Sequence, residues 1–100
     1  MNEPAVPEGY AEALARIKAD IAVPDARGTR AASSELVALY WRIGQVILDR
    51  QRSAGWGGKV VDRLSQDLRV AYPGTRGFSA TNLDYMRRFA ATVSVDEISQ

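Results

Sequence analysis

The sequence predicts an all-α fold, a small bundle of about four helices that includes a helix-turn-helix-like pair. Apolar residues recur at intervals of three and four in four separate runs, as they do in amphipathic helices. Glycine and proline gather between the runs, where they end helices and form turns. We expect helices near 8 to 22, 31 to 52, 58 to 72 and 79 to 93, and no sheet.

The first helix follows a polar leader, residues 1–7, and ends before Pro24, which cannot continue it. Charged residues separate the apolar positions of this run, so one face of the helix is apolar and the other is polar. Residues 24–29 (PDARGT) then form a short connection. The apolar face consists of Tyr10, Leu14, Ile17 and Ile21.

The second helix is the longest and is predicted to be central. It begins between Thr29 and Ser34 and runs to about Arg52. Gly44 in its middle costs about 1 kcal/mol relative to alanine, so we interpret this glycine as permitting a close crossing of two backbones. A wide apolar stripe follows the helix and comprises Leu36, Leu39, Tyr40, Ile43, Val46 and Ile47.

Trp56 stands among three glycines after the second helix and has few local partners. A ligand-stacking role is one interpretation of this indole. Packing between helices, which anchors the turn, is the interpretation that we prefer, because tryptophan is a large apolar residue with a single polar atom.

The third and fourth helices form the helix-turn-helix-like pair. Pro73 cannot continue the third helix, and Gly74 and Gly77 can supply positive backbone dihedral angles. Ser79 offers a hydroxyl to the unpaired amides of the fourth helix. The shared core is predicted to consist of Val60, Val61, Leu64, Leu68 and Ala71 from the third helix and Leu83, Met86, Phe89, Ala90 and Val93 from the fourth.

Composition limits the kind of protein. The 100 residues, 46% of them hydrophobic, suffice for one small core, so residues 1–100 are predicted to form a single domain. The chain has no cysteine and no histidine, which excludes structural zinc and the usual imidazole base. The leader has acids where a secretory signal has bases, and no apolar run reaches the roughly 20 residues of a membrane span, so we expect a soluble cytoplasmic protein.

The charge of the chain is unevenly distributed. The formal net charge is +1, but residues 50–88 carry eight Lys or Arg against three acids. At the end of the chain, Ser94 and Glu97 have the spacing of a capping box, so residues 94–100 read as the start of a truncated helix. We expect that the chain is a domain excised from a longer protein.

Two segments also carry a family resemblance. LYWRIGQVI at 39–47 and GWGGKVVDRLSQDLRVAYPGTRGFSATNLDYMRRF at 55–89 resemble the N-terminal domain of the YhcG family of bacterial proteins, long classified as a domain of unknown function. The resemblance implies an all-helical domain ahead of a C-terminal PD-(D/E)XK nuclease-like domain. It also implies an association with DNA repair, restriction or mobile-element defence.

The catalytic residues of such a nuclease are not in this chain. Its site needs carboxylates for a divalent metal and a lysine two residues after one of them. The residues two before Lys18 and Lys59 are Arg16 and Gly57, so no (D/E)-x-K is present. We therefore expect no enzyme activity, no cofactor, no catalytic residue and no metal ligand in residues 1–100. Divalent metal is expected only in the nuclease domain, which is absent here.

A non-catalytic DNA-binding role is the first functional hypothesis. The outer side of the fourth helix has chemistry suited to reading a groove, since arginine can pair with guanine and asparagine with adenine. Asp84 in the middle of that side argues against strong phosphate binding, and Arg87 and Arg88 also suit an ordinary solvated helix face. The candidate DNA-binding residues are Lys59, Arg63, Arg76, Ser79, Thr81, Asn82, Tyr85, Arg87 and Arg88.

The alternative is an oligomerisation or protein-docking domain of the same nuclease. In that case the apolar face of the first helix would meet another chain, such as a second copy in a homo-oligomer, rather than its own core. An independent enzymatic or small-ligand role is the third hypothesis. The sequence offers no evident small-molecule substrate and no membrane contact.

Overall fold

The computed structural model describes residues 7–22 and 32–93. These residues form four helices and no strand, so the predicted all-α bundle is confirmed. Each predicted boundary lies within two residues of the observed one. The connection at 24–29, most of the leader, and the capping box of Ser94 and Glu97 lie outside the described residues. The helices are α1 (Tyr10–Ala22), α2 (Ala32–Ala54), α3 (Gly58–Ala71) and α4 (Ala80–Thr92).

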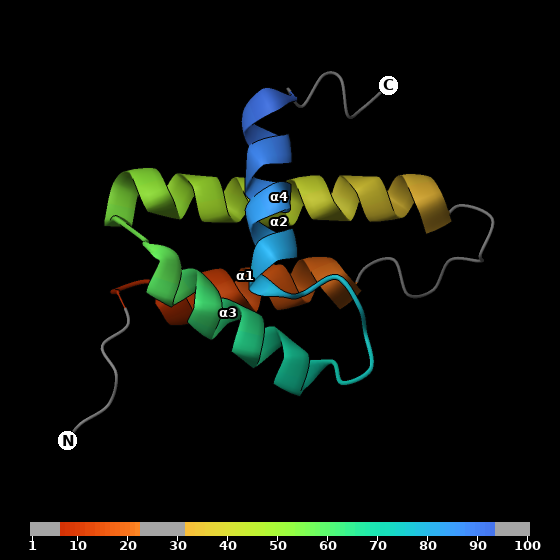
Figure 1. Ribbon diagram of the computed structural model, residues 1–100, viewed down its shortest axis with the longest axis horizontal. Coiled ribbons are helices and arrows are strands. Elements are labelled where there is room, and N and C mark those ends of the chain that lie inside the picture. Colours follow the sequence, from red (N-terminus) through yellow and green to blue (C-terminus); the bar gives the residue numbers. More distant parts are fainter. Residues whose placement is uncertain (1–6, 23–31, 94–100) are drawn as a thin grey trace.

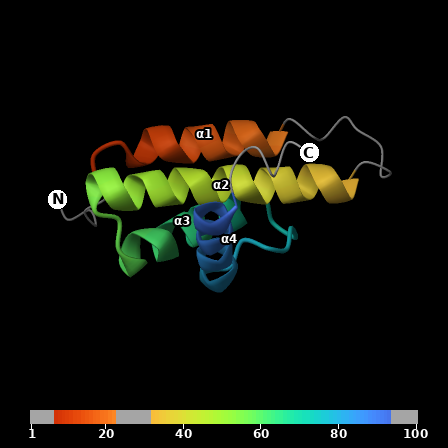
Figure 2. The ribbon, with the colours of Figure 1, turned by 90° about the horizontal axis from the view of Figure 1, so that it is seen from above.

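The long helix α2 is central, as predicted. Helix α1 runs antiparallel along one side of α2, and α4 crosses α2 on another side (Figures 1 and 2). Helix α3 packs against α4 and also meets the beginning of α1, where Tyr10 contacts Asp67. Helices α1 and α4 thus pack directly on α2, and α3 closes the core from the side of α4 and α1.

Gly44 is the point at which α4 crosses α2. A Cβ atom added to Gly44 would overlap the backbone carbonyl of Met86, would lie 2.5 Å from its carbonyl carbon and would lie 3.1 Å from the Cβ of Ala90. Only a residue without a side chain allows the two backbones to approach this closely. The predicted close crossing at Gly44 is confirmed.

The core combines residues from all four helices and from both connections that flank α3. Trp56, in the connection before α3, is 3% exposed, and its ring lies 5.7 Å from that of Tyr10, as predicted for an anchoring residue. The most buried apolar side chains are Ile17, Ile43, Ile47, Leu64, Leu68 and Leu83.

The apolar face of α1 belongs to this core. Tyr10 and Ile17 are buried in it, and Leu14 and Ile21 pack against it. The hypothesis that this face meets another chain is therefore wrong. The reason is that α2 and α3 of the same chain already cover this face, so it is not available to a second chain.

Four core predictions are wrong in detail. Ala71 is exposed because no other element covers its side of α3, and Leu36 is 44% exposed because it precedes the part of α2 that α4 covers. Phe89 and Val93 are only half-buried. Phe78, which no helical period marks, is 3% exposed, and its carbonyl accepts a 2.7 Å hydrogen bond from the buried Ser65 hydroxyl.

The turn between α3 and α4 follows its predicted chemistry. Gly74 and Gly77 have φ angles of +86° and +98°, which residues with side chains rarely adopt. Ser79 caps α4, since its hydroxyl oxygen accepts a 3.1 Å hydrogen bond from the amide of Asn82. The cap fixes where α4 begins and therefore which of its side chains face outward.

Candidate nucleic-acid interface

Helix α4 presents one side to solvent. Leu83, Met86 and Ala90 turn inward, so the residues about half a turn away from them point outward. Tyr85 is 58% exposed, and the side chain of Arg88 is 62% exposed. This exposed side, which we call the α4 outer face, consists of Thr81, Asn82, Tyr85 and Arg88.

Asp84 pairs with both arginines of α4. Arg87 donates to Asp84 Oδ1 from Nε at 3.0 Å and from Nη2 at 2.9 Å, and Arg88 Nη2 lies 3.0 Å from Asp84 Oδ2. The Arg88 guanidinium also lies 5.8 Å from the centre of the Tyr85 ring. An exposed ion pair is worth only about 0 to 1 kcal/mol, so a phosphate can compete with Asp84 for Arg88. Arg87, whose side chain is 26% exposed, is less accessible.

Arg76 and Ser79 lie in the turn that leads into α4. Arg76 is exposed, and Ser79 uses its oxygen to cap the helix while its hydroxyl proton stays available to a partner. The first backbone amides of α4 have no acceptor within the helix and carry a partial positive charge. Arg76 and Ser79 thus lie at the N-terminal end of α4, next to the α4 outer face.

Lys59 and Arg63 do not join this end. Arg63 Nε donates to both oxygens of Asp67, at 3.1 and 3.3 Å, and its guanidinium lies 5.8 Å from the centre of the Tyr10 ring. Arg63 therefore faces α1. Lys59 lies one helical turn earlier on the same side of α3, whereas Ser65, two residues beyond Arg63, faces the turn before α4.

Tyr10 and Asp67 explain why Arg63 is held there. The Tyr10 hydroxyl donates to Asp67 Oδ2 at 2.5 Å. Burial, and then this hydrogen bond, raise the pKa of Tyr10 well above its ordinary value of 10.0. The neutral tyrosine is thus a fixed donor, and Asp67 accepts from both Tyr10 and Arg63. Arg63 is thus part of the contact between α1 and α3.

A small pocket of about 270 Å³ lies beside the α4 outer face, between α2 and α4. We call it the aromatic pocket; it is lined by Tyr40, Asn82, Tyr85, Met86 and Phe89. The sequence placed Tyr40 and Phe89 in the core, but both are half-buried. Gly44 is the feature of the sequence from which the pocket could have been predicted. Two helices that cross in close contact at a glycine move apart again about one turn away, and this leaves space between their side chains.

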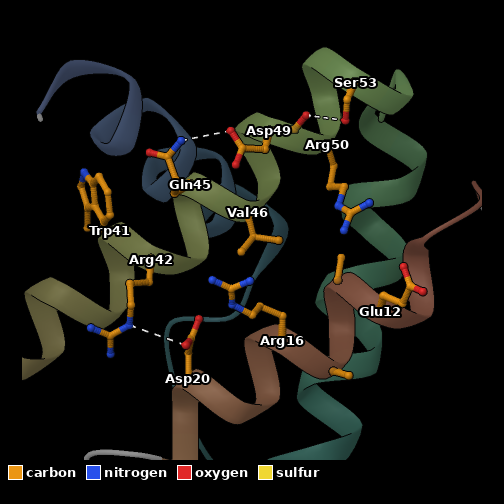
Figure 3. Close-up of a pocket in the computed structure, with 12 residues that line it drawn as sticks. Glu12, Arg16, Asp20, Trp41, Arg42, Gln45, Val46, Asp49, Arg50 and Ser53 are labelled. Atoms are coloured by element: carbon orange, nitrogen blue, oxygen red, sulfur yellow. Dashed lines mark hydrogen bonds and ion pairs between the residues drawn. The ribbon is translucent and has the colours of Figure 1, made fainter. Parts of the chain in front are cut away.

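A larger groove of about 730 Å³ separates α1 from α2 on another side of the molecule (Figure 3). Charges of both signs line it: Asp20 lies 3.7 Å from Arg42, and the chain of Arg16 extends between the helices. Trp41 and Val46 add apolar surface. Its three carboxylates, from Glu12, Asp20 and Asp49, balance its three guanidinium groups, from Arg16, Arg42 and Arg50, so the groove has no net attraction for a polyanion.

The described part of the chain has neither a cluster of metal-binding side chains nor a membrane-spanning helix. Within residues 7–22 and 32–93, no three Asp or Glu side chains come together as a metal would require. The same residues form no helix whose length and apolar character would let it cross a bilayer.

Comparison with known proteins gives one match. The family model of the DUF1016 N-terminal domain matches residues 16–100, which include the second half of α1 and all of α2, α3 and α4. No curated protein and no solved structure matches the chain. The family match covers far more than half of the chain and agrees with the resemblance of the two segments at 39–47 and 55–89. The chain therefore belongs to the DUF1016 N-terminal domain family, the N-terminal domain of YhcG-like nuclease proteins.

Proposed function

We propose that this domain is the non-catalytic, helix-turn-helix-like DNA-binding domain of a PD-(D/E)XK nuclease. The observation that carries the proposal is the α4 outer face, which exposes an arginine and an asparagine beside a capped helix N-terminus. These are the side chains that pair with base edges, and the helix N-terminus suits a phosphate. The nuclease domain would cut, and this domain would hold the DNA.

Each residue of this end has its own part in the proposal. Arg88 can leave Asp84 and bind a guanine edge or a phosphate, and Asn82 can pair with adenine. Arg76, Ser79 and Thr81 donate to phosphates and set the orientation of the helix. Because Asp84 cancels one of the two arginine charges on α4, we expect only a few phosphate contacts and therefore a shallow dependence of DNA affinity on salt.

The test is fluorescence anisotropy of a labelled duplex with residues 1–100 at two or more salt concentrations. Contact with Z phosphates gives a log–log slope near −0.9Z, so Arg76→Ala should weaken binding to all sequences and reduce the slope by about 1. Arg88→Ala should also weaken binding. Lys59→Ala is the matched control, because it removes one exposed charge on the α1 side of α3 and should change little.

Melting temperatures separate binding from folding. Arg76 and Arg88 are exposed, so their alanine variants should melt within about 2 °C of the parent, in keeping with the small effect of most surface substitutions. An affinity for DNA that survives the double change of Arg76 and Arg88 would exclude this end as the interface.

The catalytic part of the proposal has a separate test. Residues 1–100 should leave DNA and RNA intact in magnesium or manganese, because no (D/E)-x-K occurs in the sequence. Cleavage that disappears when one carboxylate of this chain is changed would show that the domain is an enzyme after all.

Docking of a protein partner is the second candidate function, and the α1–α2 groove favours it. Apolar side chains of Trp41 and Val46 lie there among balanced charges, a mixture that resembles protein interfaces more than DNA interfaces. Arg16→Glu should then alter the mass measured by light scattering or abolish capture of the nuclease domain. The DNA affinity should be unaffected, because Arg16 lies away from α4.

A further inference from the structure

The aromatic pocket exists because α4 crosses α2 at Gly44. The two backbones touch at that glycine and diverge on either side of it. Tyr40 lies one turn before Gly44 on α2, and it lines the pocket together with Tyr85 and Phe89 of α4. The diverging helices leave a wedge between these rings that no side chain fills.

The lining of the pocket selects a flat, neutral, aromatic ligand. Three aromatic rings and the thioether of Met86 form its walls, Asn82 adds one amide, and none of the five lining residues is charged. Its volume of about 270 Å³ is just below the roughly 300 to 1,000 Å³ of pockets for drug-sized molecules. A single heterocycle is of the right size and character.

We infer that the aromatic pocket binds one unpaired nucleobase of the DNA, so that the domain prefers DNA with a single-stranded or extrahelical base to a perfect duplex. The inference rests on the proposed DNA-binding function and adds the class of DNA. A stacked base inside a duplex can reach the pocket only after unpairing, which costs a few kcal/mol. In a bulge, a gap or a free strand the base is already unpaired, so binding does not require this unpairing free energy.

Asn82 provides the means of reading the base. Its amide both donates and accepts, and it is exposed at the edge of the pocket, where it can turn to meet a ligand. Asparagine pairs in two places with adenine, through N6 and N7. We therefore expect adenine to be favoured over a pyrimidine at the unpaired position.

One arginine lies against a wall of the pocket, and a second belongs to the turn that lies close to another wall. Arg88 lies over the ring of Tyr85, which forms one wall. On the other side, the Tyr40 hydroxyl lies so close to the turn that a Cβ on Gly77 would be 2.9 Å from it, and Arg76 is the residue before Gly77. A base in the pocket would thus leave its sugar and phosphates near Arg88 and near the turn that carries Arg76.

The experiment compares three labelled oligonucleotides with residues 1–100: a duplex, the same duplex with one extrahelical adenine, and the single strand. We expect tighter binding to the second and third than to the first. Tyr85→Ala should weaken binding to those two by about fivefold or more, as loss of one base-stacking contact does, and should change duplex binding less. Tyr85→Phe keeps the ring and should retain the preference.

Two further variants complete the design. Asn82→Ala should remove the preference for adenine over thymine at the extrahelical position. Val70→Ala is the control for a general loss of exposed apolar surface, because Val70 is 79% exposed on α3, and it should change nothing. Replacing the extrahelical adenine by fluorescent 2-aminopurine gives a direct readout, since stacking on a ring in the pocket quenches its emission.

The outcomes separate this inference from the proposed function. Equal affinity for all three oligonucleotides, lowered alike by Arg76→Ala and Arg88→Ala, would support DNA binding and overturn the pocket. If the Tyr85→Ala variant still bound the oligonucleotides with an unpaired base more tightly than the duplex, the pocket would not be the cause of that preference. Binding to none of the three would overturn the proposed function and the inference together.

Discussion

Gly44→Ala is the substitution that tests the packing of α4 on α2 most directly. In an isolated helix alanine is favoured over glycine by about 1 kcal/mol, so local propensity alone predicts a more stable protein. In the folded domain the added Cβ would lie 2.5 Å from the Met86 carbonyl carbon. Ordinary contacts between carbon atoms are about 3.5 to 4.0 Å, so α4 must retreat by about 1 Å.

That displacement has a larger cost than the gain in propensity. A gap of about 1 Å removes up to half of the dispersion energy of each contact it opens, and Met86 and Ala90 both lie at this crossing. Overpacking of a well-packed core typically costs about 1 to 3 kcal/mol, and the obstructing atoms here are backbone atoms, which cannot turn away. We expect a net destabilisation of about 2 kcal/mol and a fall in Tm of about 10 °C.

Urea denaturation followed by circular dichroism measures this difference. Gly58→Ala is the matched control, because Gly58 begins α3 and a Cβ there meets no atom within 4 Å. The control should be neutral or slightly stabilising. If Gly44→Ala were as stable as the parent protein, the close crossing of α2 and α4 would be wrong, and with it the wedge that forms the aromatic pocket.

Three other predictions concern the core, the cap and the effect of alkali. Leu68→Ala should cost about 2 to 5 kcal/mol of unfolding free energy because Leu68 is fully buried, and Phe89→Ala should cost less because Phe89 is half-buried; urea titrations of the two variants give the order. Ser79→Ala should cost about 1 kcal/mol by removing the cap of α4, which a thermal melt detects. The folded state raises the pKa of Tyr10, so the unfolded chain loses this proton first as pH rises above about 10, and stability falls. Tyr10→Phe should abolish that part of the alkaline loss in urea titrations at about pH 8 and pH 10.5.

The helices could be predicted because their signals are local. Pro73 and Gly74 end α3, Ser79 caps α4, and the three- and four-residue apolar spacing gives each helix its inner face. Gly44 was informative for a different reason. A glycine in the middle of a helix is unfavourable, so its presence indicated a contact that no alanine could make.

What sequence reasoning missed depends on contacts between distant residues. Phe78 is buried because the turn folds back over Ser65, and no periodicity within the turn marks it. Ala71 continues the helical spacing of α3 but has no neighbouring helix to cover it. A helical wheel predicts which side of a helix faces the core. It does not predict how far along the helix that side is covered, because this depends on the neighbouring elements.

The candidate site was predicted in part for the same reason. The outward direction of Tyr85 and Arg88 follows from the wheel of α4 and is confirmed. The separation of Arg63 from that face could not be read from the sequence. It depends on Asp67, one turn further along α3, and on Tyr10, which belongs to α1. Net charge along the chain predicted a basic segment, but it did not show which arginines share a surface.

The two tryptophans lie at different contacts of the bundle, and each can act as a local optical probe. Trp56 is buried against Tyr10, where α1 meets the beginning of α3, whereas the Trp41 indole N–H donates to the carbonyl of Val93 at 2.8 Å and ties α2 to the end of α4. Tryptophan emission shifts to the red when water reaches the ring. In a Trp41→Phe variant, the emission of Trp56 reports on the contact between α1 and the beginning of α3. In a Trp56→Phe variant, the emission of Trp41 reports on the contact between α2 and the end of α4. Each single-tryptophan variant thus reports on one of these two contacts without an attached dye.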